Sequence, residues 1–324
     1  MNNGVRVPTL FSRNGKLALA LFLFSALPLV AQDTPVGAPG TLVATEETPA
    51  AATNADELRK AAQNPVASLI SVPVQDNFNF NISPGDRTQG VLNIQPVIPT
   101  RISENWNLIA RVITPIIYQP LPPVNGQVTS QGVRGLGDIN PTFFLSPAKP
   151  SKVIWGVGPA FVLPTATSIY LGQGKWSMGP SIVVLTQPGH WTLGALVNNV
   201  WSYAGHSDRQ DVNQMLFQYF INYNLKKGYY ITWQPTILAN WEASSPNRWT
   251  VPFGGGIGRI MKLGFQPVNL TLQFYGNPVR PSGTSPWGMR MQIAFLFPKL
   301  TKQQQKMMME QKLKQLDQES SQKN

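Results

Sequence analysis

The sequence predicts an all-β fold: a transmembrane, antiparallel, up-and-down β-barrel of about 12 strands, with a short N-terminal helix and a polar C-terminal tail. The first observation is that apolar and polar residues alternate from about Ser68 to Phe297, which is the pattern of strands with two different faces. The second is length, since most predicted strands hold about 11–14 residues and a tilted strand needs about 9–11 to cross a bilayer. The third is that short connections alternate with long ones, as in outer-membrane barrels.

The N-terminus predicts export. Residues 1–31 read as a secretory signal peptide, because Arg6, Arg13 and Lys16 precede an apolar run that ends at Ala31. The run holds about 15 residues, fewer than the roughly 20 that a spanning helix needs. Cleavage after Ala31 is therefore expected, and an uncleaved N-terminal anchor is the alternative.

Residues 32–66 read as a periplasmic linker followed by a short helix. The linker is rich in Pro, Thr and Ala. The helix is predicted over Thr53–Pro65, where Asn54 and Glu57 have the spacing of a capping box and Pro65 ends the pattern. This helix either enters the barrel as a plug or lies in the periplasm.

The composition is unusual for a soluble enzyme. Charged residues make up 13% of the 324-residue chain, against about 25% in soluble domains. There is no cysteine, so the exported domain must fold without disulfides. The net charge is +11, but much of it lies in the signal peptide and the tail, and no basic stripe interleaves with aromatic residues. We therefore expect outer-membrane lipid, and not nucleic acid, as a partner.

The predicted barrel covers residues 67–298. In the last strand, for example, Met289, Met291 and Ile293 alternate with Arg290 and Gln292. Aromatic residues near both ends of several apolar faces predict interfacial girdles. The strands are expected at residues 68–81, 89–99, 105–118, 134–146, 152–163, 175–186, 190–203, 211–225, 228–241, 248–260, 267–277 and 286–297.

The connections predict the orientation. Those after the even-numbered strands are brief, and those after the odd-numbered strands are mostly longer, as at residues 119–133 and 164–174. In outer-membrane barrels the short turns are periplasmic and the long loops are outside. An even number of strands then leaves both termini in the periplasm.

The polar face is rich in Asn and Gln and carries few charges, which predicts a narrow, amide-lined lumen for small neutral solutes. The alternative is that its few charged groups only pair with one another inside a packed interior. The side chains expected to form a constriction or to contact a plug are Arg111, Asp138, Arg290, Asn140, Gln234 and Gln273.

Several prolines fall inside predicted strands, where proline cannot donate a ladder hydrogen bond. Pro141 and Pro159 share the apolar face of their strands, as do Pro96, Pro180 and Pro235. A closed barrel has no edge on which to place them. We expect these sites to be β-bulges or bends, where the ladder is already interrupted.

Several runs of the chain resemble a known family. These runs are QNPVASLISVPVQDNFNF, VLNIQPVIPT, GLGDINPTFFLSP, WGVGPAFVLPTAT and NRWTVPFGGGIG. They are similar to a transporter family of Gram-negative outer-membrane β-barrels, also labelled meta-pathway phenol-degradation proteins and sometimes misnamed neuromedin U. The resemblance covers roughly Ala61 to Lys299 and implies a barrel that passes small, aromatic or otherwise apolar compounds. The tail of residues 299–324 departs from members that end on the last strand's aromatic residue, which here is Phe297.

Catalytic signals are thin. No cofactor and no metal site is predicted, because the chain has no Cys, no His pair and no carboxylate cluster. His206 stands beside Ser207 and Asp208 in a predicted outer loop, but three consecutive loop residues do not easily converge on one atom. Gly254–Gly258 lies within a strand pattern and predicts a thin strand that bends or lets another segment approach closely.

The sequence therefore predicts a non-enzymatic channel of the cell outer membrane for small neutral or aromatic solutes. A non-conducting structural or surface barrel is the alternative, and an outer-membrane hydrolase is the third hypothesis. The basic tail 299–324 is expected to be a polar helix or unstructured, with anionic lipid or a periplasmic protein as its candidate contact. No oligomeric state is predicted.

Overall fold

The predicted strands are present and close into one barrel. The computed structural model describes residues 58–123, 127–128, 131–149 and 151–298. The predicted signal peptide (1–31), the linker up to residue 57 and the tail 299–324 lie outside the described residues. Between them the chain is almost entirely β, with one short α-helix at residues 58–62 and two 3-10 turns, η1 (Lys226–Gly228) and η2 (Ser245–Asn247).

Fifteen strand segments make up twelve barrel strands, because three of the strands are each interrupted once. The interruptions separate β2 from β3, β5 from β6 and β11 from β12. Every boundary of the twelve strands lies within about three residues of its predicted position, because the period-2 pattern fixes the strands closely. The segments are β1 (Ile70–Ile82), β2 (Arg87–Ile94), β3 (Val97–Arg101), β4 (Trp106–Pro120), β5 (Gly132–Leu136), β6 (Asn140–Pro147), β7 (Val153–Val162), β8 (Lys175–Thr186), β9 (Trp191–Gly205), β10 (Asn213–Asn224), β11 (Tyr229–Trp233), β12 (Thr236–Asn240), β13 (Trp249–Leu263), β14 (Gln266–Val279) and β15 (Trp287–Phe297).

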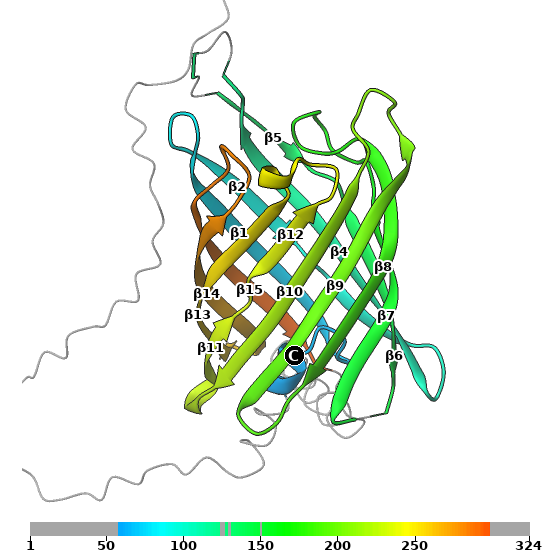
Figure 1. Ribbon diagram of the computed structural model, residues 1–324. Coiled ribbons are helices and arrows are strands. Elements are labelled where there is room, and N and C mark those ends of the chain that lie inside the picture. The colour runs from blue at the N-terminus through cyan, green and yellow to red at the C-terminus, as the bar shows by residue number, and fades with distance from the viewer. Residues whose placement is uncertain (1–57, 124–126, 129–130, 150, 299–324) are drawn as a thin grey trace, which may run out of the picture. The chain divides into compact units, whose positions relative to one another are not determined.

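All strand pairings are antiparallel, and each strand pairs with its neighbours in the sequence. The ring is closed by the first and last strands, which pair from Ile70↔Phe297 to Phe80↔Trp287. Figure 1 shows the strands tilted around the barrel axis. The predicted all-β, up-and-down barrel of 12 strands is thus confirmed.

The two ends of the barrel differ. The end that holds the short helix, here called the helix end, has tight connections: β13 stops at Leu263 and β14 begins at Gln266. The opposite end, here called the loop end, carries the longer connections (Figure 1), such as the one from Val162 to Lys175. The exception is the loop-end turn between β1 and β2, which runs only from Ile82 to Arg87.

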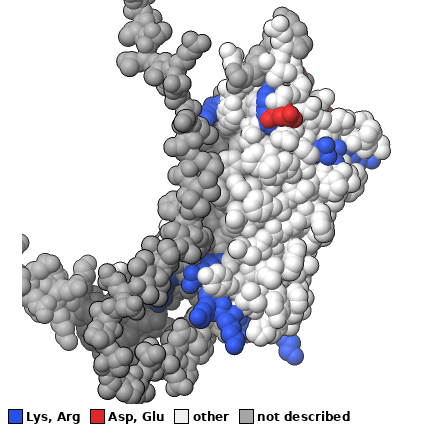
Figure 2. Space-filling model, turned by 90° about the vertical axis from the view of Figure 1, so that its left-hand side faces the viewer, with Lys and Arg blue, Asp and Glu red and all other residues white. Residues whose placement is uncertain are grey.

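One face of the outer surface has an uncharged band. Figure 2 shows that Lys, Arg, Asp and Glu gather at the two ends of the visible face and leave the middle free of charge. On the strands, apolar side chains such as Ile182 and Ile257 are exposed. A charged side chain on a lipid-facing strand costs about 2–4 kcal/mol at the bilayer midplane, so the band fits a hydrocarbon environment. Among the described residues no helix is both long and apolar enough to cross a membrane.

Aromatic side chains cluster toward both ends of the strands, as predicted for interfacial girdles. At the helix end, the rings of Trp106 and Trp155 lie 5.9 Å apart and those of Trp191 and Tyr223 lie 4.7 Å apart. At the loop end, Tyr203 of β9 is exposed. Amphipathic rings favour the headgroup level of a bilayer, so these two zones bound the apolar band.

The bulge prediction is wrong for Pro141 and Pro159. The register is continuous through both residues, with Val112↔Pro141 on one ladder and Pro159↔Pro180 on another. A bulge does lie beside Pro252, where the register shifts between Val251 and Phe253. Pro96 and Pro235 stand at the interruptions of two strands, after Ile94 and after Trp233.

The ladder is instead left open beside the facing prolines. Because neither Pro159 nor Pro180 has an N–H, the pair is not hydrogen-bonded and each ring nitrogen faces the next strand. On the β6–β7 ladder the pairing stops at Thr142↔Ala160 and resumes at Leu145↔Val157 without a register shift. On the β8–β9 ladder it stops at Met178↔Trp201 and resumes at Ser181↔Asn198, again without a shift. The missing donors therefore coincide with gaps in the ladder and need no extra residue.

The glycine run Gly254–Gly258 behaves as predicted, because another segment approaches it closely. A Cβ added to Gly258 would overlap the ring of Tyr230, which lies over this strand. The Tyr230 hydroxyl donates to Asn269 Oδ1 of β14 at 2.7 Å. The side chain thus crosses the whole width of β13 inside the barrel, in the space that the glycine leaves free.

Candidate functional site

The barrel interior contains a cavity of about 760 Å³. One part of its wall is built from amide side chains of β1, β2 and the interruption that follows β2. Several of these amides bind one another; Asn79 Nδ2, for example, donates to Gln89 Oε1 at 2.7 Å. The amide wall consists of Gln75, Asn77, Asn79, Gln89, Asn93 and Gln95.

The opposite part of the wall mixes apolar and polar side chains. In the ring of twelve strands, β9 stands half-way round from β1. Inward-facing side chains on β6 to β10 line this side of the cavity, and polar residues stand among the apolar ones: Thr142, Ser181, Asn198, Gln214 and Gln218. The apolar wall consists of Phe144, Ala160, Val162, Leu196, Val200 and Leu216. The lumen therefore presents hydrogen-bonding groups on both sides, with a set of apolar side chains added on the side opposite β1.

Residues 58–67, here called the plug segment, close the helix end of the lumen. On one side, Leu58, Ala61 and Ala62 pack against Ala294 and Leu296 of β15. This segment is the short helix and turn that appear at the lower end of the barrel in Figure 1. Of the two placements considered for the predicted helix, the lumen is the one observed.

On the other side, the plug segment is held by strands β4 to β10. Val66 is 4% exposed and packs in a cluster with Ile109, Phe144, Val183, Leu185, Leu196 and Phe220. Gln63 is buried, donates to Asn224 Oδ1 at 2.8 Å, and accepts from the Thr192 hydroxyl at 2.8 Å. The segment therefore bridges both sides of the lumen through apolar packing and hydrogen bonds.

A second cavity, of about 160 Å³, lies between the plug segment and the main cavity. Five side chains line both cavities and so mark the place where they meet. This junction ring consists of Gln75, Gln95, Arg111, Leu196 and Gln218. Any solute that passes along the lumen toward the helix end must cross this ring.

Arg111 is the charged member of the junction ring. Its Nη2 donates to Gln95 Oε1 at 2.9 Å. Among the described residues that line the two cavities there is no carboxylate. The interior is thus positively charged at its junction.

Arg290 also lines the main cavity, but it is held by groups on other strands. Its Nε donates to Asn77 Oδ1 at 3.0 Å and its Nη1 donates to the Gln234 carbonyl at 3.1 Å. The guanidinium carbon lies 5.1 Å from the centre of the Tyr275 ring. Gln234 stands where β11 and β12 separate, so Arg290 satisfies a carbonyl at a gap in the wall.

Replacing Arg290 with Met is expected to destabilise the barrel, because it removes both hydrogen bonds. Bonds to a charged group contribute about 1.5–3 kcal/mol each. Arg111→Met is the matched control, since it removes only the one bond to Gln95. The midpoint of urea unfolding in lipid vesicles, followed by tryptophan fluorescence, should fall further for Arg290→Met. Equal midpoints for the two variants would contradict this assignment.

The remaining sequence-predicted residues are divided between wall and loop. Asn140 lines the main cavity, and its Nδ2 donates to the Asp138 carbonyl at 2.6 Å. Gln234 lines the smaller cavity and donates to Asn222 Oδ1 at 3.1 Å. Gln273 is 2% exposed and its Oε1 accepts from the Tyr275 hydroxyl. Asn140 and Gln234 therefore face the lumen, and Gln273 supports Tyr275.

Asp138 has a different set of partners from the other candidates. Its carboxylate accepts from the backbone N–H of Ala166 at 3.2 Å and of Gln173 at 2.6 Å. Both belong to the loop between β7 and β8. The structure thus brings Asp138 together with a loop-end segment, whereas Arg111 and Arg290 lie along the lumen.

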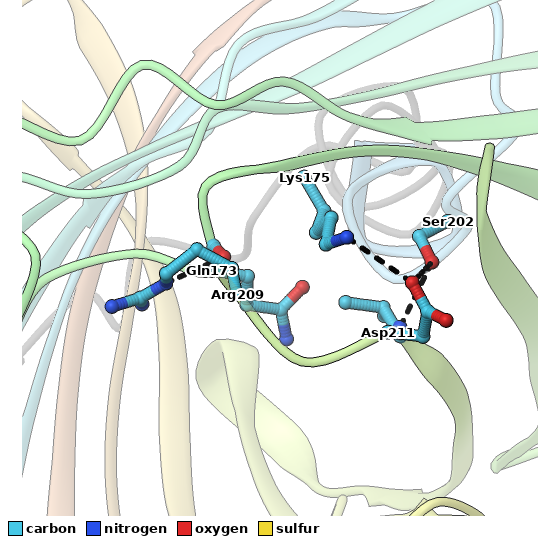
Figure 3. Close-up of polar contacts among 6 residues, drawn as sticks. Gln173, Lys175, Ser202, Arg209 and Asp211 are labelled. Carbon is cyan, nitrogen blue, oxygen red and sulfur yellow. Dashed lines mark hydrogen bonds and ion pairs between the residues drawn. The ribbon is translucent and has the colours of Figure 1, made fainter. Parts of the chain in front are cut away.

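The same loop is joined to its neighbour at the mouth of the barrel. Arg209 donates to the carbonyl of Gln173 at 3.1 Å, and Lys175 Nζ lies 3.1 Å from Asp211 Oδ1. Figure 3 shows these side chains reaching between the two loop segments, with Ser202 beside Asp211. These contacts fix two of the longer loops relative to each other, so the mouth has a defined shape.

The loop triplet His206, Ser207 and Asp208 does not form a hydrogen-bonded set. Among the hydrogen bonds of the described residues, none joins the side chains of these three. The backbone N–H of His206 donates to the Gly174 carbonyl at 3.1 Å, and its carbonyl accepts from Arg209. His206 therefore forms part of a backbone turn that is hydrogen-bonded to the neighbouring loop.

Comparisons with solved structures identify the fold. The chain is similar to an outer membrane channel from Pseudomonas putida F1, with a TM-score of 0.53 and 12% identity over 71% of this chain and 96% of that one. The two chains share a fold. The NanC porin (TM-score 0.45, 10% identity, 70% and 100% of the two chains) and the CymD monoaromatic hydrocarbon channel (0.42, 10%, 75% and 93%) also match.

Sequence comparison gives no family. No protein-family model matches the chain, and no curated protein matches it. The family resemblance carried by runs such as WGVGPAFVLPTAT therefore stays a prediction.

The amide-rich face that the sequence predicts supplies three of the five junction-ring residues, namely Gln75, Gln95 and Gln218. The sequence did not indicate that these three lie at a constriction. Leu196 was missed altogether. Its strand, β9, carries apolar residues on both faces, so alternation alone did not mark it as inward-facing.

Proposed function

We propose that this protein is a channel of the cell outer membrane that passes small neutral or aromatic solutes. The observation that carries the proposal is the mixed lumen, in which an amide wall faces apolar side chains interspersed with amides around a cavity of about 760 Å³. An aromatic solute with one polar substituent satisfies both walls, whereas a fully polar solute leaves the apolar wall in contact with its polar groups.

The proposed orientation places the helix end in the periplasm and the loop end outside. The short connections at the helix end and the longer ones at the loop end support it, because outer-membrane barrels distribute them in this way. In the same proposal, residues 1–31 are a signal peptide, residues 32–66 a periplasmic linker that ends in the plug, residues 67–298 the barrel and residues 299–324 a basic tail.

The second candidate is a non-conducting structural barrel. The plug segment favours it, because Gln63 and Val66 are buried and bridge the lumen. A channel then requires that solutes pass beside this segment or that it moves. Conductance separates the two candidates.

Purified protein in planar lipid bilayers is expected to give discrete conductance steps, and phenol on the loop-end side should reduce the current in a concentration-dependent way. Leu216→Asn, which adds an amide to the apolar wall, should weaken the effect of phenol. Asn198→Gln, which keeps an amide at the same cavity, is the matched control. An absence of conductance steps for correctly folded protein would favour the structural barrel, and conductance without any effect of phenol would exclude the aromatic part of the proposal.

A further inference from the structure

The junction ring contains a cation with unused hydrogen-bond donors. A guanidinium carries five N–H groups, and one bond, to Gln95, is present for Arg111. The other guanidinium nitrogens of Arg111 make no hydrogen bond to a described residue, and the side chain is half-buried. They are therefore accessible from the cavities that Arg111 lines.

The neighbours of Arg111 in the junction ring are all uncharged. Gln75, Gln95 and Gln218 supply neutral amides, and Leu196 supplies an apolar surface in the same ring. No carboxylate of the described lining competes for the cation. Arg290, in contrast, already donates to Asn77 and Gln234 and is not part of the ring.

We propose that the junction ring is a binding site for small organic monoanions, specifically a carboxylate attached to an apolar body. The carboxylate accepts from Arg111, whose planar fork matches its two oxygens. The amides of Gln75 or Gln218 supply further donors, and the apolar body lies against Leu196 and the apolar wall. The proposal rests on the proposed channel function and extends its solute class to carboxylates.

Charge selectivity follows from the same arrangement. Rings of Arg or Lys select anions in pores, because a narrow passage with low-dielectric walls concentrates the field of the charge. With Arg111 at the junction and no carboxylate in the described lining, chloride and organic anions are favoured over potassium.

The test combines reversal potentials with block by two matched aromatic compounds. Under a KCl gradient, the wild-type protein is expected to be anion-selective. Benzoate should cause brief interruptions of the current at concentrations where neutral benzyl alcohol causes few. Arg111→Gln should move the reversal potential toward zero and weaken benzoate block at least about tenfold, since bonds to charged groups are the strong ones.

Two variants serve as controls. Arg101→Gln makes the same change of net charge at an exposed position at the helix end, where Arg101 donates to the Ser103 and Glu104 carbonyls, and should leave selectivity unchanged. Arg111→Lys should keep the anion selectivity and shorten the benzoate events, because ammonium lacks the planar fork. All variants are checked for a heat-modifiable, folded band on gels.

The outcomes separate this inference from the channel function. A conducting wild type that is cation-selective, or an Arg111→Gln variant with unchanged selectivity and benzoate block, would overturn the inference and leave the channel intact. If no conductance is seen, the channel function fails, and equilibrium dialysis of benzoate against the detergent-purified barrel decides the inference. Saturable binding that Arg111→Gln weakens at least about tenfold supports it, and equal binding by the two proteins overturns it.

Discussion

Deleting residues 32–66 while keeping the signal peptide is expected to raise the single-channel conductance at least about twofold, because the helix end of the lumen is then no longer obstructed. Residues 58–66 stand between the small cavity and the periplasmic side in the proposed orientation, and they bridge β15 to the strands on the opposite side. Planar-bilayer recordings of the wild type and the deletion variant measure the change directly.

The deletion also removes Val66 from its apolar cluster, so some loss of stability is expected. Burial of one such side chain contributes about 1.5–3 kcal/mol. Gln63→Ala is a milder test, since it removes the hydrogen bonds to Asn224 and Thr192 and leaves Val66 in place. It should increase the frequency of transitions to the higher conductance level. Identical conductance in all three proteins would mean that the plug segment does not control passage.

Replacing Gly256 with Ala is expected to prevent much of the protein from forming a closed barrel. A Cβ at this position would overlap the backbone carbonyl oxygen of Leu272, and backbone atoms of a paired strand cannot move aside as a flexible side chain can. Overpacking of this kind costs about 1–3 kcal/mol or more. The fraction of folded, heat-modifiable protein after refolding into lipid vesicles measures the effect.

Gly276→Ala is the matched control on the adjacent strand. A Cβ there would lie 3.9 Å from the nearest neighbouring atom, the Phe253 carbonyl oxygen, which is an ordinary contact. This variant should fold like the wild type. If both variants fold equally well, β13 does not require glycine at position 256, and its close approach to β14 is not a condition of closure.

The strands could be predicted from the sequence because each one repeats the same physical signal. In the strand that ends the barrel, outward Met291 and inward Arg290 alternate as lipid and lumen require. The interior was harder to predict, because several inward positions are apolar. Ile109 and Phe144 face the lumen and contact Val66, and such residues weaken the alternation on which the assignment depends.

The site could be predicted only in part, since its contacts join segments far apart in the sequence. Nothing near Asp138 in the sequence indicates that two loop N–H groups bind its carboxylate. Likewise, the short helix pattern at residues 53–65 fits the periplasm as well as the lumen. Only the fold brings Gln63 to Asn224, 161 positions along the chain.

The pairing of β1 with β15 constrains how this protein can be made. The N-terminal strand obtains its second partner only when the final strand, Trp287–Phe297, has been synthesised. Until then both strands have an edge of unpaired backbone groups, which lipid cannot solvate. The chain must therefore be carried to the membrane complete and unfolded, and a version truncated before Trp287 should aggregate instead of inserting. Assembly is thus a single late event that depends on the C-terminal strand.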